Sequence, residues 1–271
     1  MAHLETSAKK VWQQRMTFKR WMGWFSWLFI LSFFMLCWQA MTQNTLWVFV
    51  LDAPTQAADL IDRMFPPRWS YITALLKPLW DTLNIATLGT LFGIILAFPI
   101  AFLAAHNTTP SRFFVRPIAL FIIVASRSIN SLIWALLLVA IFGPGLFAGI
   151  IAIALRSVGF VAKLLYEAIE EVDKTPIKAL TSTGASAVQV MDYAIIPQIL
   201  PTFIGVSLFR WDINIRESTI LGLVGAGGIG LELQASLSVL AWPQVILIVL
   251  LIFITVILSE AFSAKIRNAI I

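Results

Sequence analysis

Long apolar runs separated by short polar segments are the main pattern along this chain. A helix needs about 20 mostly apolar residues to cross the hydrocarbon core of a bilayer. The mostly apolar runs of about this length are Trp21–Met41, Leu79–Ala105, Pro117–Phe142, Leu146–Tyr166 and Pro243–Phe262. A further crossing is placed between Pro201 and Gly222, where charged residues interrupt the apolar run. The pattern therefore predicts an all-α integral membrane protein with six transmembrane helices.

Basic residues beside these runs predict the orientation, because Lys and Arg accumulate on the cytoplasmic side of membrane spans. They precede the first run and follow the second and last runs: Lys9, Lys10, Arg15, Lys19, Arg20, Arg112, Arg116, Lys265 and Arg267. Both termini are then cytoplasmic, and Thr42–Pro78 lies on the far face with a short surface helix at Ala57–Phe65. A cleaved signal peptide is disfavoured, because the first run is longer than the usual signal core and no clear cleavage site follows it.

Composition excludes several classes of function. The chain has 271 residues, of which 59% are hydrophobic and 12% charged, whereas soluble domains carry about 25% charged residues. One cysteine, Cys37, and two distant histidines, His3 and His106, predict neither a disulfide nor a metal site. The net charge of +5 is dispersed along the chain, which fits membrane orientation better than binding of nucleic acid.

A polar stretch at 167–201 interrupts the apolar pattern and predicts two short helices. Thr175 is the expected N-cap of Pro176–Thr183, and Gly184 is expected to take a left-handed conformation after it. Ser186 can cap a second helix, Ala187–Ile196, which is expected to close at Pro197 because proline lacks an N–H and clashes with the preceding turn. The alternative is an ordinary amphipathic connector on the membrane surface.

The spacing of Ala179, Gly184, Pro197 and Pro201 resembles the cytoplasmic "EAA" loop of ABC importer permeases. The loop reads KAL here, so Lys178 stands at the family's glutamate. The resemblance implies a coupling helix that fits a groove on an ATPase subunit. It assigns this contact to Lys178, Ala179, Leu180, Gly184, Ala185 and Pro197.

The segment from Gly222 to Gly230 contains the spacing of a dinucleotide-binding loop. No acidic residue lies about twenty positions further on, and the flanking segments are membrane spans, so a Rossmann site is rejected. Together with ASRSIN at 125–130, this segment resembles the phosphonate and phosphite branch of the ABC importer permeases. The resemblance covers about residues 79–265 and implies a type I five-helix core in 79–271, with residues 1–78 as an addition. It places a periplasmic gate region at Gly225, Gly227, Gly228 and Gly230.

Charged residues in the predicted spans need partners, water or a role, because they are costly at bilayer depth. At 100° per residue, Arg210, Asn214 and Glu217 share one helix face, and Asp212 and Arg216 share another. The pairs Asp212–Arg216 and Arg210–Glu217 can be internal ion pairs, or these residues can contact the cargo. Arg127 and Arg156 have no carboxylate in their own spans, which predicts contact with an anionic cargo. The candidate pathway residues are Arg127, Asn130, Arg156, Arg210, Asn214 and Arg216.

The chain contains no GxxxxGK[ST] pattern, so it is not expected to hydrolyse ATP itself. The resemblance implies a homodimer in the bacterial inner membrane, two ABC ATPase subunits that bind ATP and Mg, and a periplasmic solute-binding protein. No cofactor, metal or catalytic residue is predicted in this chain. An ion-coupled secondary transporter of a small anion is the alternative, since the charged span meets one expectation for that class. The cargo, whether phosphonate, phosphite or another oxyanion, stays open.

Overall fold

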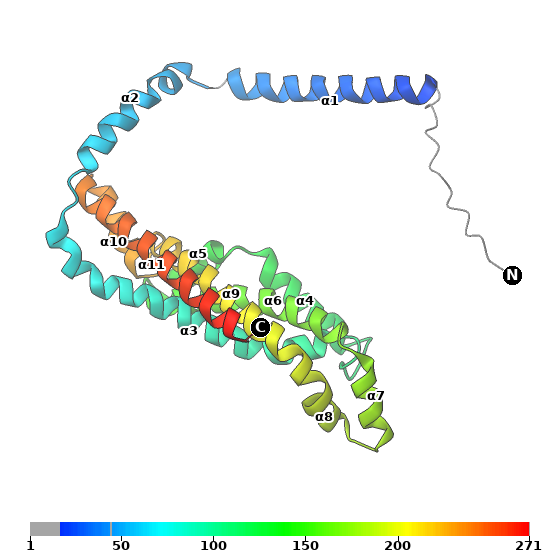
Figure 1. Cartoon of the computed structure of the whole chain (residues 1–271). Helices are drawn as coiled ribbons and strands as arrows, with labels where there is room; N and C mark the ends of the chain where they lie inside the picture. The colour runs from blue at the N-terminus through cyan, green and yellow to red at the C-terminus, as the bar shows by residue number, and fades with distance from the viewer. Residues whose placement is uncertain (1–16, 44, 271) are drawn as a thin grey trace. The chain divides into compact units, whose positions relative to one another are not determined.

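The computed structural model describes residues 17–43 and 45–270, and every regular element in this part of the chain is helical (Figure 1). The chain divides into two compact units, Met1–Asp59 and Leu60–Ile271. Lys9, Lys10 and Arg15, on which the orientation rests in part, lie outside the described residues. The placement of both termini in the cytoplasm therefore stays a prediction.

Helix α1 (Thr17–Gln43) confirms the first predicted span. Large apolar side chains from Trp21 to Met41 are exposed around the whole helix, as expected for a helix surrounded by lipid. Helix α2 (Trp47–Met64) is longer than the predicted surface helix at Ala57–Phe65. The helix is present, but its predicted start was wrong, because Asp52 lies on the helix rather than in a loop. Its carboxylate accepts hydrogen bonds from Thr55 Oγ1 at 2.5 Å and from Gln56 Nε2 at 2.8 Å.

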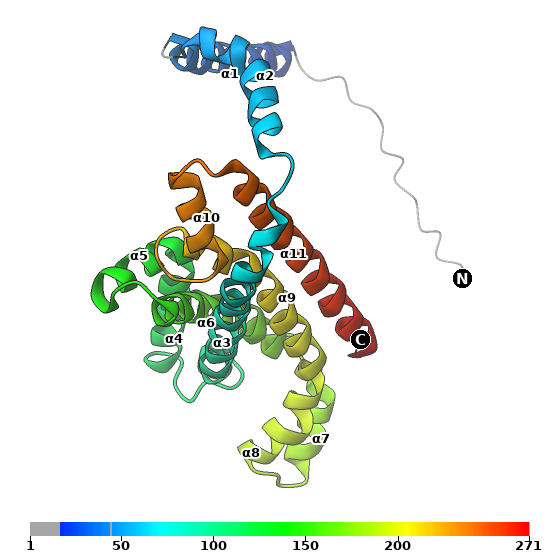
Figure 2. The ribbon, with the colours of Figure 1, turned by 90° about the vertical axis from the view of Figure 1, so that its left-hand side faces the viewer.

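The second unit is built around three long helices, α3 (Ile72–Ala104), α6 (Leu146–Glu170) and α9 (Ile196–Gly222). All three pack against one another, while α4 and α5 cover α6, and α11 (Trp242–Ile270) packs on α9 (Figures 1 and 2). Glycines allow α3 to approach α6 closely. A Cβ atom on Gly89 would lie 2.7 Å from Ile153 Cγ2, and one on Gly93 would lie 2.5 Å from Ser157 Cβ. Helix α3 follows a short 3₁₀ turn, η1 (Trp69–Tyr71), and begins earlier than Leu79.

The predicted single span Pro117–Phe142 is broken into α4 (Val115–Ser128) and α5 (Ser131–Phe142), which meet at 89°. Ile129 and Asn130 have extended backbones, with ψ of 130° and 145°. The Asn130 side chain accepts the N–H of Leu132 at 3.1 Å and caps α5. An asparagine that can cap a helix competes with continuing one. Among the described residues, five helices are long and apolar enough to cross a membrane, and counting the bent pair as one span gives six, the predicted number.

The polar stretch also differs from the prediction after Ser186. Helix α8 (Ala187–Val190) continues through a π-helical segment, η2 (Met191–Ile195), directly into α9. The helix therefore does not close at Pro197. This proline follows the π-helical segment directly, so the irregular backbone hydrogen bonding of the continuous helix coincides with the position that lacks an N–H. Helix α7 (Lys174–Ser182) and α8 lie at one end of the second unit, and α10 (Ile229–Ser238) lies at the other (Figures 1 and 2).

Candidate functional site

Residues 173–190 form a helical hairpin, the α7–α8 hairpin, whose shape is set by local hydrogen bonds. Asp173, rather than the predicted Thr175, is the N-cap of α7. Its carboxylate accepts the Thr175 N–H and the Thr175 hydroxyl, both at 2.9 Å. These two hydrogen bonds, the backbone one first, lower the pKa of Asp173 below its usual range. Asp173 replaces Thr175 as the cap because a carboxylate is a stronger hydrogen-bond acceptor than a threonine hydroxyl.

The turn of the hairpin follows the prediction. Gly184 has φ of +79°, the left-handed conformation that glycine adopts without a steric penalty. Ser186 then caps α8 in a capping box with Gln189: the Gln189 N–H donates to Ser186 Oγ at 3.4 Å, and the Ser186 N–H donates to Gln189 Oε1 at 2.8 Å. The hairpin therefore holds its shape although nearly all of it is exposed.

The residues that the resemblance assigns to coupling lie on this hairpin, with one exception. Lys178, Ala179 and Gly184 are exposed, and Leu180 and Ala185 are half-buried. Pro197 lies apart from them, at the start of α9. The structure therefore brings together five of the six predicted residues.

A groove of about 660 Å³ runs between the two arms of the hairpin and the loop that joins α3 to α4. Ile177 and Thr181 of α7 line one side of the groove, and Val188 and Met191 line the other. Thr108 lines it from the loop. Val188 is 65% exposed, and neighbouring Tyr193 is 74% exposed. Exposed apolar side chains on a rigid hairpin are typical of a surface that contacts another protein.

The hairpin is tied to α9 by a pair of hydrogen bonds. The Asp173 N–H donates to Gln198 Oε1 at 2.9 Å, and Gln198 Nε2 donates to the Asp173 carbonyl at 3.3 Å. A movement of the hairpin would therefore pull on α9 at two points, through this contact and through the continuous helix α8–η2–α9.

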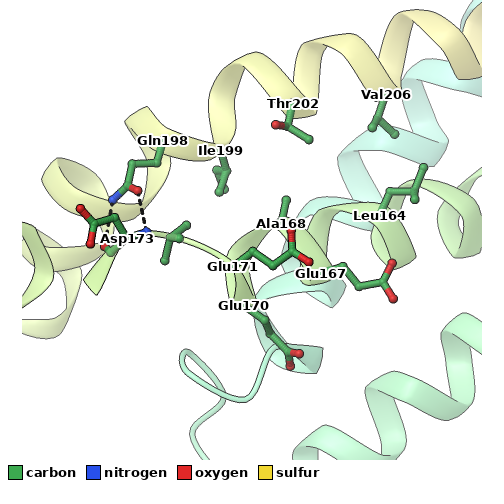
Figure 3. Close-up of a pocket in the computed structure, with 11 residues that line it drawn as sticks. Leu164, Glu167, Ala168, Glu170, Glu171, Asp173, Gln198, Ile199, Thr202 and Val206 are labelled. Carbon is green, nitrogen blue, oxygen red and sulfur yellow. Dashed lines mark hydrogen bonds between the residues drawn. The ribbon is translucent and has the colours of Figure 1, made fainter. Parts of the chain in front are cut away.

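A cleft of about 820 Å³ opens beside this attachment, between the end of α6 and the start of α9 (Figure 3). Glu167 and Glu171 line it on one side, and Gln198 and Thr202 on the other. Glu170 points away from α9 in Figure 3. Its carboxylate instead accepts the His106 N–H at 2.8 Å and pairs with Arg116 at 3.3 Å. These bonds fix the end of α6 to the α3–α4 loop and to the first turn of α4.

A polar network lies deeper in the second unit, where α3, α6 and α9 meet. Arg210, which is 2% exposed, donates from Nε to Ser157 Oγ at 3.1 Å. Asn214 donates from Nδ2 to Ser157 Oγ at 2.9 Å and to Thr90 Oγ1 at 2.7 Å. The Asn214 Oδ1 atom is buried and has no partner among the described residues. Sequence reasoning missed Ser157 and Thr90, since lone hydroxyl residues in apolar helices are common and only their packing reveals a partner.

The ion pairs expected within α9 are confirmed. Arg210 Nη2 lies 3.3 Å from Glu217 Oε2, and Arg216 Nη2 lies 2.6 Å from Asp212 Oδ2. The other oxygen of Asp212 accepts the Ser259 hydroxyl of α11 at 3.0 Å. The Asp212 carboxylate therefore links α9 to α11, whereas Glu217 faces α6.

Two expectations about the remaining arginines need correction. Arg156 is not without a carboxylate, because its Nε lies 3.4 Å from Glu217 Oε1 of another helix. Arg127 and Asn130, expected within the single span Pro117–Phe142, do not lie on one helix, because α4 ends between them. Both are exposed, and no ion pair of Arg127 occurs within residues 17–43 and 45–270. Only Arg156, Arg210 and Asn214, of the six pathway candidates, lie around one network.

The glycine-rich segment forms a tight turn between α9 and α10. Gly225, Gly227 and Gly228 have φ of +90°, +84° and +75°. The turn is held to α3 by the Ile229 N–H, which donates to Thr82 Oγ1 at 2.7 Å, and to the start of α6 by the Gly145 N–H, which donates to the Gly225 carbonyl at 3.0 Å. The turn is therefore a fixed junction of four helices.

The family described as "Binding-protein-dependent transport system inner membrane component" matches residues 89–268. The phosphite transport system permease protein PtxC of Stutzerimonas stutzeri is 39% identical over 228 residues, which are 82% of each chain. The phosphate-import permease protein PhnE of Mycolicibacterium smegmatis is 36% identical over 222 residues, 82% of this chain and 42% of that protein.

Solved structures show the same fold. The MetNI methionine ABC transporter in an inward-facing conformation aligns with a TM-score of 0.65 at 21% identity, over 75% of this chain and 99% of that one. A bacterial ABC transporter that imports alginate aligns with a TM-score of 0.61 at 17% identity, over 90% of this chain and 98% of that one. The family match and the identity to the phosphite permease favour the importer over the ion-coupled secondary transporter. The chain belongs to the family of binding-protein-dependent transport system inner membrane components and is a multi-pass permease subunit of an ABC importer.

Proposed function

We propose that this permease carries a small phosphorus oxyanion, phosphite or a phosphonate, across the bacterial inner membrane. The observation that carries the proposal is the 39% identity to a phosphite permease over 82% of both chains. A network of arginines among membrane-spanning helices agrees with an anionic cargo, because guanidinium groups match the geometry of tetrahedral oxyanions. The permease itself makes and breaks no covalent bond.

The proposal includes the partners that drive transport. Two copies of the permease pair around the path, two ATPase subunits bind ATP and Mg below them, and a periplasmic solute-binding protein delivers the cargo. The α7–α8 hairpin supports this arrangement, since it exposes a capped, apolar surface at the end of the second unit that is predicted to be cytoplasmic. Lys178, Ala179, Leu180, Gly184 and Ala185 form the contact with the ATPase.

Coupling then runs from the hairpin into α9. When ATP binding closes the ATPase subunits, the hairpin moves, and the Asp173–Gln198 hydrogen bonds pass this movement to α9. Helix α9 carries Arg210, Asn214 and Arg216, and it ends at the glycine-rich turn. Movement of α9 thus changes both the charged part of the path and the gate region formed by Gly225, Gly227, Gly228 and Gly230.

Transport by the reconstituted complex tests this function. The permease, its ATPase and its binding protein are placed in proteoliposomes, and uptake of phosphite and of methylphosphonate is measured with and without ATP. We expect uptake of at least one of these anions only in the presence of ATP and the binding protein. Uptake that continues without nucleotide and stops with an ionophore would establish the ion-coupled mechanism instead.

A further inference from the structure

Three charged groups from α6 and α9 meet near the middle of α6: Arg156, Arg210 and Glu217. Glu217 contacts both guanidinium groups: its Oε1 lies 3.4 Å from Arg156 Nε, and its Oε2 lies 3.3 Å from Arg210 Nη2. Two positive charges and one negative charge leave an excess of +1 at this point. Arg156 lies ten residues into α6, roughly 15 Å along the helix axis at 1.5 Å per residue. An excess charge at such a depth requires an anion or water nearby.

Arg210 is not available to a cargo. Its side chain is 2% exposed, its Nε donates to Ser157, and its guanidinium lies over the Phe160 ring with Cζ 5.3 Å from the ring centroid. It is a positioning residue that holds the Glu217 carboxylate in place.

Arg156 is in a different situation. Its side chain is 30% exposed, and its one ion pair in the described part of the chain is the long contact from Nε. Neither Nη atom has a hydrogen-bond partner among the described residues. The fork of N–H groups that binds an oxyanion in a bidentate manner is therefore free. The surrounding face of α6 also carries Lys163, 30% exposed and paired with Glu167, so this face meets water or protein rather than lipid.

We propose that Arg156 binds the anionic cargo and that Glu217 is its exchangeable counter-ion. The inference rests on the proposed function and adds to it the residue that contacts the cargo. When the cargo arrives, its oxygens take the free fork of Arg156 and neutralise the excess charge, while Glu217 keeps its contact with Arg210. When the cargo leaves, Glu217 again shields Arg156. An empty site therefore never leaves a guanidinium entirely without a counter-ion, which would be costly.

Chemical labelling of arginines tests the site without depending on transport. The complete complex in nanodiscs is treated with phenylglyoxal, with or without phosphite or methylphosphonate, and labelled positions are found by mass spectrometry. We expect Arg156 to be labelled, Arg210 to be protected throughout, and either anion to reduce labelling of Arg156 several-fold. The Glu217→Gln variant should increase labelling of Arg156 in the absence of anion. Labelling of Arg156 that neither anion changes would overturn the proposal.

Transport by variants gives a second test. Arg156→Gln should reduce uptake by about ten-fold or more, the range expected for a lost charged hydrogen bond, with ATPase activity within two-fold of wild type. Arg156→Lys keeps the positive charge but loses the fork of N–H groups, so its uptake should lie between that of wild type and that of Arg156→Gln. Arg112→Gln removes one exposed positive charge from the α3–α4 loop and should transport normally. Normal uptake by Arg156→Gln in a complex that imports phosphite would mean that the ion pair is structural only. If the wild-type complex imports neither anion, the proposed cargo is wrong, and protection from labelling decides the anion site by itself.

Discussion

The two ends of the second unit use glycine for different physical reasons. Gly184, in the α7–α8 hairpin, has φ of +79°, and a Cβ atom there would have nothing within 4 Å. Gly230, at the start of α10, needs no positive φ, but a Cβ atom there would lie 1.9 Å from the Thr219 carbonyl oxygen. The first glycine is required for backbone conformation and the second for space. Replacing Gly184 should therefore disturb only the local backbone of the hairpin, whereas replacing Gly230 should disrupt the packing of α10 against α9.

Gly230→Ala should give the largest effect, because the added methyl group would force α10 away from α9. We expect a loss of about 3 kcal/mol or more in the free energy of unfolding, at the upper end for overpacked sites. The melting temperature and the yield of monodisperse protein measure this. Gly23→Ala is the matched control, since a Cβ atom there meets nothing within 4 Å. Equal stability of the two variants would contradict the packing argument.

Gly228→Ala should be the next most damaging, because this position combines both reasons. Its φ is +75°, and a Cβ atom would lie 2.5 Å from Thr82 Oγ1. We expect a loss of about 1–3 kcal/mol in stability. In a double-mutant cycle with Thr82→Ala, the two losses should sum to more than the loss in the double variant, because removing the hydroxyl also removes the clash. Additive losses would show that conformation alone matters at this position.

Gly184→Val should leave the fold intact and disturb the hairpin alone. A left-handed conformation costs a residue with a Cβ atom about 1–2 kcal/mol, so the turn should change shape. We expect more ATP hydrolysed per anion imported by the reconstituted complex. Gly184→Asn should come closer to wild type, since asparagine tolerates positive φ better. Coupled uptake at the wild-type ratio in the valine variant would argue against the hairpin as the coupling element.

Asp173→Asn should have the smallest effect. Asparagine also caps helices well, so the variant loses only the charge of the acceptor. The Thr175 hydrogen bonds lower the pKa of Asp173 in the folded state. Their contribution to stability is therefore present above the unfolded pKa of about 3.9 and is lost as the pH falls through the lower folded pKa. Hydrogen exchange of the first turn of α7 should differ between the variant and wild type at neutral pH, and the difference should vanish in strong acid. A difference in hydrogen exchange between Asp173→Asn and wild type that is the same at every pH would contradict the predicted loss of this stabilisation in acid.

The sequence determined the features that depend on neighbours along the chain. Hydrophobic runs of membrane length gave the positions of the long helices, because each run must satisfy its own backbone hydrogen bonds. The left-handed turn at Gly184 and the cap at Ser186 were predicted from local conformational preferences. Helix geometry placed Arg210 with Glu217 and Asp212 with Arg216 because both partners of each pair lie on one helix, but it left open whether they form ion pairs or contact the cargo; the structure shows both ion pairs.

Only the tertiary structure decided the features that depend on residues distant in sequence. Arg156 acquired its counter-ion from α9, 61 positions further along the chain, and no periodicity within α6 indicates that contact. The turn at Gly228 is fixed by Thr82 of α3. At Asn130 the helix breaks, and at Pro197 it continues. In both places local helix preference competes with packing against neighbouring helices, and the packing decides the outcome. Local helix propensities amount to less than about 1 kcal/mol for most residues and to about 3 kcal/mol for proline, so contacts between helices can override them where the two disagree.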